Sequence, residues 1–266
     1  MSAMLQGDNE RMLVRRDEGG VAHLTLNRPA QFNSLSQAML ETLIVELDAI
    51  AQDASVRVVV LGGEGKAFCA GHDLKEMRGN HTFEFQQALF RLCSKFMMKL
   101  VELPQPVIAR IHGIATAAGC QLASMCDLAV AADVARFAVS GINVGLFCAT
   151  PSVGLSRNVG RKQAFEMLVT GEFIDAHEAQ RRGLVNRVVP LEQLDDEIAK
   201  LTASICAKSP VAIRMGKQMF YRQLEMGMDA AYQTAAETMA CNMMTEDAAE
   251  GIDAFIGKRK PEWRGR

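Results

Sequence analysis

The stretch HGIATAAGCQLASMCD, residues 112–127, carries the clearest indication of how this chain folds. A run of very small residues leads out of an apolar segment into a sequence with helical spacing. A helix start directs free N–H groups, and the positive end of the helix dipole, at whatever lies in front of it. We therefore expect a tight strand-to-helix turn suited to stabilising a developing negative charge. The first polar side chain of this helix is Gln121, a neutral amide, so the start of the helix supplies no acid or base of its own.

The segments on either side alternate between strand and helix patterns. Apolar, β-branched runs predict strands, whereas apolar residues at three- and four-residue spacing predict helices. Strand and helix in alternation predict an α/β layered core with right-handed crossovers. The predicted strands are 21–29, 56–65, 104–113, 128–133 and 136–140, and the predicted helices are 34–53, with Ser34 or Ser36 as its cap, and 83–102.

The pattern changes near residue 190. From there on the spacing predicts helices alone, at 191–207, 210–226, 228–241 and 245–257. We expect an α/β core over 1–190 and a helical region over 191–266. Such helices must bury their apolar faces either on the core or on a second copy of the chain.

Composition excludes several classes of protein. Of the 266 residues 49% are apolar and 23% charged, and the net charge of −2 gives no reason to expect nucleic acid or a membrane surface as partner. No apolar run approaches the roughly 20 residues of a membrane helix, and residues 1–20 lack the apolar segment of a secretory signal. Seven scattered cysteines without a CxxC pair predict free thiols in a reducing compartment, either the cytoplasm or an organelle matrix.

Familiar ligand motifs are absent from the sequence. GGEGKAF, residues 62–68, fails as a phosphate loop because Val60 and Ala67 stand where glycine and Ser or Thr are needed. No GxGxxG joins a strand to a helix, and no His or Cys spacing suggests a metal site. Cys120 and Cys148 have no neighbouring base in the sequence, so buried thiols are the better interpretation than nucleophiles.

A second segment, FCAGHDLKEM at 68–77, repeats the tight approach to a helix start, with Asp73 as its cap. Free N–H groups near His72 and near Ala118 could converge on one carbonyl oxygen as an oxyanion hole, which stabilises an enolate-like charge. Both segments could equally be tight turns and nothing more. Spacing alone does not choose between the two.

Five segments resemble the enoyl-CoA hydratase/isomerase, or crotonase, superfamily in the order that the family has them. The resemblance implies an α/β spiral of ββα units, followed by an all-helical C-terminal region that builds trimers, often paired into hexamers. Its activity would belong to fatty-acid or related acyl-CoA metabolism. The segments are LNRPAQFNSLS (26–36), VVVLGGEGKAFCAGHDLKEM (58–77), HGIATAAGCQLASMCDLAVAA (112–132), LVTGEFIDAHEAQRRGLVNRVVP (168–190) and EGIDAFIGKRKPEW (250–263).

The resemblance also implies a set of binding residues. The thioester carbonyl would lie between the backbone N–H groups of His72 and Ala118, which form the family's oxyanion hole. Coenzyme A would be part of the substrate, with no separate cofactor and no metal. The residues implied in acyl-CoA binding are Gln31, Phe32, His72, Asp73, Leu74, Lys75 and Ala118, with Phe255 and Lys258 reaching the site of a neighbouring subunit.

The catalytic positions depart from the family. Hydratases of this family hold a water between two glutamates, and this chain has Gln121 and Gly141 in those places. Gln121 can position a water but cannot take its proton at neutral pH, and Gly141 has no side chain. With the SGINVGLFC segment at 140–148, this combination resembles the subgroup called enoyl-CoA hydratase domain-containing protein 3. Efficient hydration by the usual route is not expected.

Two functions remain open from the sequence. One is a lyase or isomerase acting through an enolate-like intermediate, with its acid–base group supplied by His72, Asn143 or Cys148, in that order, or by the more remote Glu64. The alternative is a non-catalytic acyl-CoA-binding or regulatory protein. Asp127, after the helix of the opening stretch, is interpreted as a structural hydrogen-bonding group.

Overall fold

The computed structural model describes residues 11–266, so the start of the segment in which we expect no secretory signal lies outside the described residues. A six-stranded sheet forms the base of the molecule, in the order β1-β2-β3-β5-β7-β10. β1 and β2 form an antiparallel pair that the sequence analysis did not predict, and the remaining neighbours are parallel. Its strands are β1 (Leu13–Glu18), β2 (Val21–Leu26), β3 (Val58–Gly63), β5 (Val107–Ile111), β7 (Leu128–Ala132) and β10 (Arg187–Val189).

A smaller, four-stranded sheet has the order β4-β6-β8-β9. Each strand of the large sheet from β3 to β7 is followed directly by a strand of the small sheet and then by helix, so the chain winds as ββα units. The spiral of ββα units is thereby confirmed. The added strands are β4 (Ala67–Cys69), β6 (Ile114–Thr116), β8 (Arg136–Ala138) and β9 (Ile174–Asp175).

Helices cover both faces of the large sheet. Side chains of β3 alternate: Val59 and Leu61 belong to the main core, while Val58 and Val60 face the other side and pack with α9 (Leu194–Cys206). All four are at most 2% exposed, so this strand is buried on both faces. The other helices of the body are α2 (Gln37–Ala51), α3 (Leu74–Gly79), α4 (Phe83–Glu102), α5 (Ala118–Met125), α6 (Ala149–Asn158), α7 (Arg161–Thr170) and α8 (Ala176–Arg181), with short 3-10 turns η1 (Pro29–Gln31), η2 (Ser140–Val144) and η3 (Leu191–Gln193).

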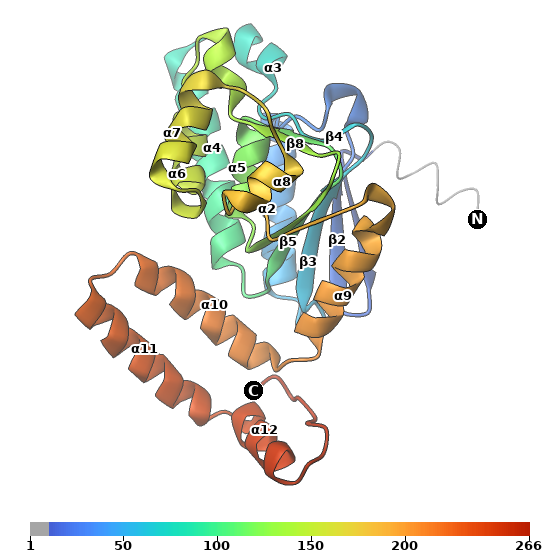
Figure 1. Ribbon diagram of the computed structural model, residues 1–266, viewed down its shortest axis with the longest axis vertical. Coiled ribbons are helices and arrows are strands. Elements are labelled where there is room, and N and C mark those ends of the chain that lie inside the picture. Colours follow the sequence, from blue (N-terminus) through green and yellow to red (C-terminus); the bar gives the residue numbers. More distant parts are fainter. Residues whose placement is uncertain (1–10) are drawn as a thin grey trace.

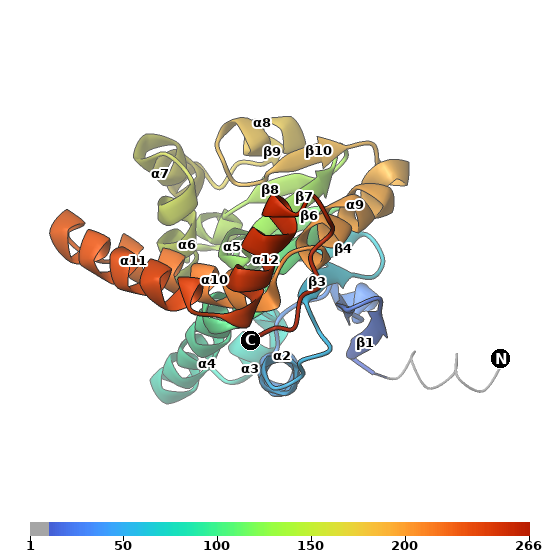
Figure 2. The same cartoon turned by 90° about the horizontal axis from the view of Figure 1, so that it is seen from below.

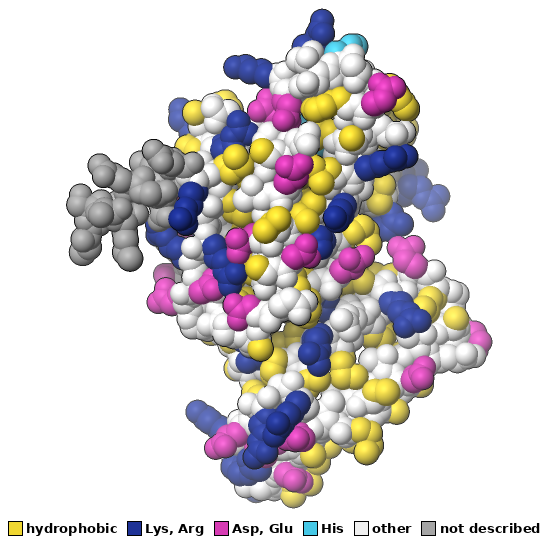
Figure 3. Space-filling view, turned by 180° about the vertical axis from the view of Figure 1, so that it is seen from behind, with side chains coloured by type: hydrophobic (Ala, Val, Ile, Leu, Met, Phe, Trp, Pro, Cys, Tyr) yellow, Lys and Arg dark blue, Asp and Glu magenta, His cyan; other side chains and the backbone are white. Residues whose placement is uncertain are grey.

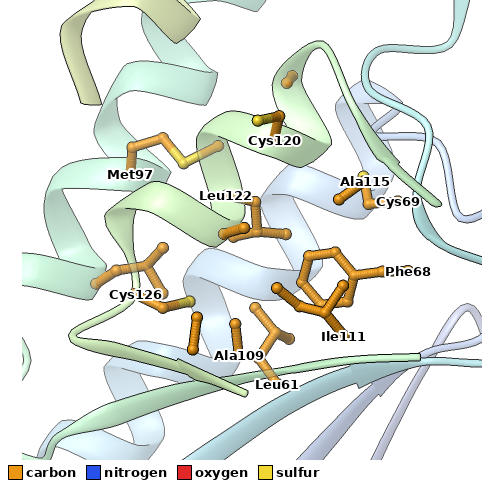
Figure 4. Close-up of a cluster of buried hydrophobic side chains, with 14 of the residues drawn as sticks. Leu61, Phe68, Cys69, Met97, Ala109, Ile111, Ala115, Cys120, Leu122 and Cys126 are labelled. Carbon is orange, nitrogen blue, oxygen red and sulfur yellow. The ribbon is translucent and has the colours of Figure 1, made fainter. Parts of the chain in front are cut away.

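The core beneath α5 fixes that helix against the sheets. Cys120 and Leu122 of α5 lie among side chains from β3, β4, β5, β6 and α4 (Figure 4). Gly119 approaches β4 so closely that a Cβ added there would overlap the carbonyl oxygen of Cys69. The small residues of the opening stretch therefore serve this close approach, and they set the start of α5 rigidly in place.

The last three helices extend away from the body as an arm (Figures 1 and 2). They are α10 (Pro210–Leu224), α11 (Met228–Met243) and α12 (Glu246–Ile256), and α11 has no buried residue. Yellow apolar side chains are visible over this end of the molecule in Figure 3. The large apolar side chains of the arm that are exposed are Phe220, Leu224, Met228, Tyr232, Met239, Met243, Ile252, Phe255 and Ile256.

Asp127 holds the arm to the body. Lys217 of α10 donates to Asp127 Oδ2 at 2.6 Å and to the carbonyl oxygens of Leu100 and Gln105, and Tyr221 donates to Asp127 Oδ1 at 2.8 Å. Burial lowers the pKa of Lys217, and the charge of Asp127 opposes that effect. The structural role expected for Asp127 is confirmed.

Candidate functional site

A cavity of about 230 Å³ opens between two parts of the body. One wall is formed by the segment before α3, by α3 and α4, and by the start of α5. The other wall is the segment 140–151, which includes η2 and the start of α6. The lining residues are Ala70, His72, Leu74, Met77, Phe90, Ala117, Ala118, Ser140, Gly141, Val144, Leu146, Phe147, Cys148, Ala149, Thr150 and Pro151.

The lining is almost wholly apolar. Among the described residues, no Asp, Glu, Lys or Arg lines this cavity. The volume is below the roughly 300–1,000 Å³ of pockets that enclose a drug-sized ligand, so a small apolar group fits inside while a larger attached group would lie outside. Acid–base chemistry here depends on uncharged groups.

The backbone segments that carry the N–H groups of His72 and Ala118 are in contact. A Cβ added at Gly71 would lie 3.1 Å from the nitrogen of Ala118, so the two backbone segments are in contact, and Gly71 has the left-handed φ of +93°. Both His72 and Ala118 line the cavity. Ala118 is the first residue of α5, where N–H groups have no partner within the helix.

Neither N–H group is used elsewhere in the described part of the chain. The bridge between Leu35 and His72 is made by the N–H groups of Leu35 and Asp73, so the N–H of His72 takes no part in it. The first bond of α5 runs from Gln121 N–H to Ala117 O, one turn after Ala118. Two free donors on adjacent segments can hold one oxygen atom between them.

The turn that precedes α5 is strained. Ala117 has φ +51° and ψ −120°, a conformation that residues with a Cβ rarely adopt. Its N–H donates to Ala138 O at 3.0 Å, which holds the turn against β8. Strain of this kind persists only where the surroundings impose it, and it sets the direction in which the next N–H, that of Ala118, points.

Gln121 is buried at 4% exposure on α5, and it does not line the cavity. Its Oε1 has no hydrogen-bond partner among the described residues. Gln121 follows Ala118 by three residues and therefore shares a helix face with it.

The space around Gly141 leaves no room for a side chain. A Cβ placed there would lie 2.5 Å from the carbonyl oxygen of Leu146 and 2.7 Å from Cys148 Sγ. The loop is closed by a bond from Leu146 N–H to Gly141 O at 2.9 Å. In this loop conformation a Cβ at 141 has no room unless the loop shifts, and the thiol of Cys148 occupies the space that a side chain would enter.

His72 and Cys148 are the titratable side chains of the described cavity lining. Burial lowers the pKa of His72, with a smaller opposing effect from its hydrogen bond to the Leu35 carbonyl. Burial raises the pKa of the Cys148 thiol, which the N–H of Gly141 partly offsets. Both groups are therefore held uncharged near neutral pH.

The other acid–base candidates lie elsewhere. Asn143 donates to Gly171 O at 3.4 Å, and neither Asn143 nor Glu64 lines the cavity. Burial raises the pKa of Cys120 to about 12, as expected for a buried thiol. Among the described residues, no group of three or more His, Cys, Asp or Glu side chains is placed to hold a metal ion.

Of the residues expected to contact coenzyme A, one leucine belongs to the lining and two others lie on a neighbouring segment. Leu74 lines the cavity and is exposed, and the Ala70 N–H donates to the Phe32 carbonyl at 3.0 Å, which places the segment of Gln31 and Phe32 beside it. Asp73 caps α3, accepting from Lys75 and Glu76 N–H groups, which confirms the expected cap.

Phe255 and Lys258 do not line this cavity. Phe255 is 85% exposed in α12, and Lys258 follows that helix directly. α12 and α3 lie at opposite ends of the longest axis (Figure 1). Within one chain, these two residues and the cavity are far apart.

The sequence analysis did not identify Phe90 and Ser140 in the cavity lining, or the contact between the hydroxyls of Ser140 and Thr116, 2.7 Å apart. Phe90 lies within a regular amphipathic helix and carries no local signal. The hydroxyl pair joins residues far apart in sequence, on β6 and η2. A spacing pattern contains no information on either contact.

Comparisons with known proteins agree with this geometry. A family model described as enoyl-CoA hydratase/isomerase matches residues 16–266. The chain is 44% identical over 252 residues to enoyl-CoA hydratase domain-containing protein 3, mitochondrial, of Xenopus laevis, across 95% of this chain and 86% of the relative. A solved enoyl-CoA hydratase from Mycobacterium smegmatis is 60% identical with a TM-score of 0.94, covering 96% of this chain and 99% of its own. The solved human enoyl-CoA hydratase domain-containing protein 3 is 42% identical with a TM-score of 0.93, covering 95% and 100%.

These relatives include the subgroup expected from the SGINVGLFC segment, so that expectation is confirmed, as is the fold. Among the described residues, no helix is both long and apolar enough to cross a membrane.

Proposed function

The chain belongs to the enoyl-CoA hydratase/isomerase family, and we propose that it binds an acyl-CoA thioester and acts on it through an enolate-like intermediate. The observation that carries the proposal is the pair of free N–H groups, from His72 and Ala118, at the wall of an apolar cavity. In this arrangement the thioester oxygen accepts both hydrogen bonds, the acyl group fills the cavity, and the nucleotide lies outside.

The proposed reaction is an isomerisation or cleavage rather than efficient hydration. Addition of water needs a placed acid and a placed base, and no carboxylate lines the described cavity. Isomerisation and cleavage next to the carbonyl need the oxyanion hole and fewer proton-transferring groups. The relative from Mycobacterium smegmatis is called an enoyl-CoA hydratase, so hydration is the activity to measure first.

The test is the loss of the conjugated-thioester absorbance of crotonyl-CoA on mixing with the purified protein, with calorimetric binding of butyryl-CoA alongside. We expect binding without hydration at ordinary enzyme rates, which are about 1–10³ s⁻¹. Turnover at such rates would overturn the non-hydratase part of the proposal. Failure to bind butyryl-CoA would overturn the whole of it.

Of positions 121 and 141, only position 121 has room for a carboxylate. Gln121→Glu preserves size on α5, whereas Gly141→Glu would collide with Leu146 and Cys148. Gln121→Asn is the matched control, because it shortens the amide without adding charge. Hydration that appears in Gln121→Glu and not in Gln121→Asn would support an intact thioester site that lacks its base.

We further propose that the arm docks onto another copy of the chain. Phe220, Met228, Tyr232 and Phe255 are each more than half exposed, and an apolar surface of this kind favours association. Docking would let Phe255 and Lys258 reach a neighbour's site, as the family resemblance implies. Analytical ultracentrifugation should give a trimer or a dimer of trimers, and a monomer at micromolar concentration would overturn this proposal.

A further inference from the structure

The lining of the cavity offers no positive charge to a ligand. Within residues 11–266, the residues of the lining that carry a polar or titratable side chain are His72, Ser140, Cys148 and Thr150. The hydroxyl of Ser140 is already paired with another hydroxyl at 2.7 Å, and burial raises the pKa of the Cys148 thiol. Serine, threonine and a protonated thiol are uncharged, so only His72 could supply a cation.

His72 does not supply one. Its Nδ1 lies 3.2 Å from the carbonyl oxygen of Leu35. A carbonyl only accepts, so Nδ1 carries the proton of the neutral ring. Burial lowers the pKa of His72, so the ring is uncharged at neutral pH, and its Nε2 is buried without a partner among the described residues. The imidazole therefore offers a ligand neither a positive charge nor an N–H.

The nearby cations along the chain point elsewhere. Lys75, Arg78 and Arg91 each follow a residue of the lining directly, yet all three are exposed and none of them lines the cavity. A carboxylate taken into the cavity would lose its water without gaining a counter-ion there. Burial of an unpaired charge is strongly unfavourable, so the cavity suits a neutral group.

The volume of the cavity sets the size of that group. An apolar cavity of roughly 150 Å³ takes up benzene, which has six carbon atoms. In proportion, the cavity of about 230 Å³ has room for about nine carbon atoms. A butyryl group has four carbon atoms and would leave much of this space unfilled.

Beyond this volume an acyl chain would meet water. Val144, Leu146 and Phe147 line the cavity and are 66%, 42% and 43% exposed. The cavity is therefore open to solvent along the loop that carries them. Methylene groups that extend past it are only partly removed from water, so they contribute less to binding than those inside.

We propose that the cavity selects neutral acyl chains of medium length, about six to ten carbon atoms, and rejects acyl groups that end in a carboxylate. The inference rests on the proposed function, since it takes the thioester to be held at the N–H groups of His72 and Ala118 with the acyl chain inside the cavity. Burial of methylene groups sets the preferred length, and the lack of a counter-ion sets the preference for a neutral end.

The first test is calorimetric binding of butyryl-, octanoyl- and dodecanoyl-CoA, each below its micellar concentration, to the purified chain. A fully buried methylene group contributes about fourfold in affinity. Because the cavity is open on one side, we expect octanoyl-CoA to bind at least about tenfold more tightly than butyryl-CoA. Dodecanoyl-CoA should bind within about threefold of octanoyl-CoA. Equal affinity for butyryl- and octanoyl-CoA, or an equally large gain from octanoyl- to dodecanoyl-CoA, would overturn the preferred length.

The second test compares adipyl-CoA with hexanoyl-CoA. Both acyl groups have six carbon atoms, and they differ in the terminal carboxylate of adipyl. The coenzyme A part is the same, so the ratio of their affinities reports on the acyl end alone. We expect adipyl-CoA to bind at least about tenfold more weakly. Equal affinities would overturn the rejection of a charged end.

A pair of valines provides a matched test of where the acyl chain lies. Val144 lines the cavity and is 66% exposed, whereas Val45 of α2 does not line it and is 68% exposed. Val144→Lys and Val45→Lys add the same charge at exposed positions, so both variants should fold. We expect the affinity of adipyl-CoA relative to hexanoyl-CoA to rise about three- to fivefold in Val144→Lys, where the lysine supplies a counter-ion, and to stay unchanged in Val45→Lys. The same ratio in both variants would overturn the placement of the acyl chain in this cavity.

The outcomes separate the inference from the proposed function. Binding of the thioesters without discrimination by length or terminal charge would overturn the inference and leave thioester binding standing. Failure of all five thioesters to bind would overturn the proposed function instead.

Discussion

The two walls of the cavity are built in different ways. At the start of α5 the wall is main chain, pressed against β4 so closely that Gly119 has no room for a Cβ. On the opposite side, the loop around Gly141 is also too tight for a Cβ, yet its neighbours Val144, Leu146 and Phe147 are exposed. The wall at the start of α5 is held by the core of the protein. The wall around Gly141 is a surface loop that can shift.

This difference separates the groups proposed to bind the substrate from the groups that would transform it. The groups proposed to hold the thioester oxygen are N–H groups in the fixed wall, and they do not depend on side-chain identity. The groups that could transfer protons are side chains, of which the fixed wall supplies His72 and the loop supplies Cys148. Changes in those side chains can therefore alter the chemistry without removing the N–H groups proposed to bind the thioester.

The largest effect is expected from Gly119→Ala. The new Cβ would overlap the carbonyl oxygen of Cys69, a backbone atom of β4 that the surrounding core prevents from moving. We expect a loss of about 3 kcal/mol or more in the free energy of unfolding, measured by urea denaturation, with loss of butyryl-CoA binding. A variant as stable as the parent would show that this wall is not fixed.

Gly141→Ala should lower the free energy of unfolding less than Gly119→Ala does. Its Cβ would meet Leu146 O at 2.5 Å and Cys148 Sγ at 2.7 Å, but the exposed loop can shift outward. We expect a loss of about 1 kcal/mol by the same measurement, with binding of butyryl-CoA retained. A cost equal to that of Gly119→Ala would remove the distinction between the two walls.

Ala117→Gly should stabilise the protein, in contrast to the two glycine substitutions. Glycine adopts the positive φ of this turn without the penalty that alanine incurs, although it also loses more backbone freedom on folding. We expect the free energy of unfolding to rise by about 1 kcal/mol, checked in the same urea series. Destabilisation would mean that the Cβ of Ala117 contributes more packing than its strain costs.

The smallest effect should be a pH dependence of stability due to His72. Because its folded pKa lies below 6.5, the unfolded chain binds more protons once the pH falls below that value, and stability decreases there. His72→Phe should remove this contribution, so unfolding at pH about 7.5 and about 5.5 should differ less in the variant than in the parent. An unchanged difference would contradict the lowered pKa.

The sequence predicted the helix caps and helix bounds that depend on neighbouring residues. Ser36 caps α2, Asp73 caps α3, and α4 spans the expected 83–102, because each depends on residues within one or two turns. β1 escaped prediction since its burial alternates little and its pairing depends on β2. The small-residue run indicated the fixed wall correctly, as a close approach of main chain.

The sequence predicted only part of the structure of the second wall, the segment 140–151. The absence of a side chain at Gly141 could be seen, whereas the exclusion of one depends on Leu146 and Cys148 folding back onto it. Likewise, the free Nε2 of His72 follows from the carbonyl of Leu35, a contact between segments 37 residues apart. No spacing rule relates these partners, because the turns of the spiral bring them together.

The main-chain origin of the two free N–H groups has a consequence for inheritance. Every amino-acid codon other than those for proline encodes a residue with an N–H, so almost any missense mutation at positions 72 and 118 leaves a donor in place. A gene for this fold can therefore accumulate changes in the side chains around the cavity without losing the donors proposed to hold the thioester oxygen. Homologous proteins that keep these two donors can therefore differ in the reaction that they catalyse.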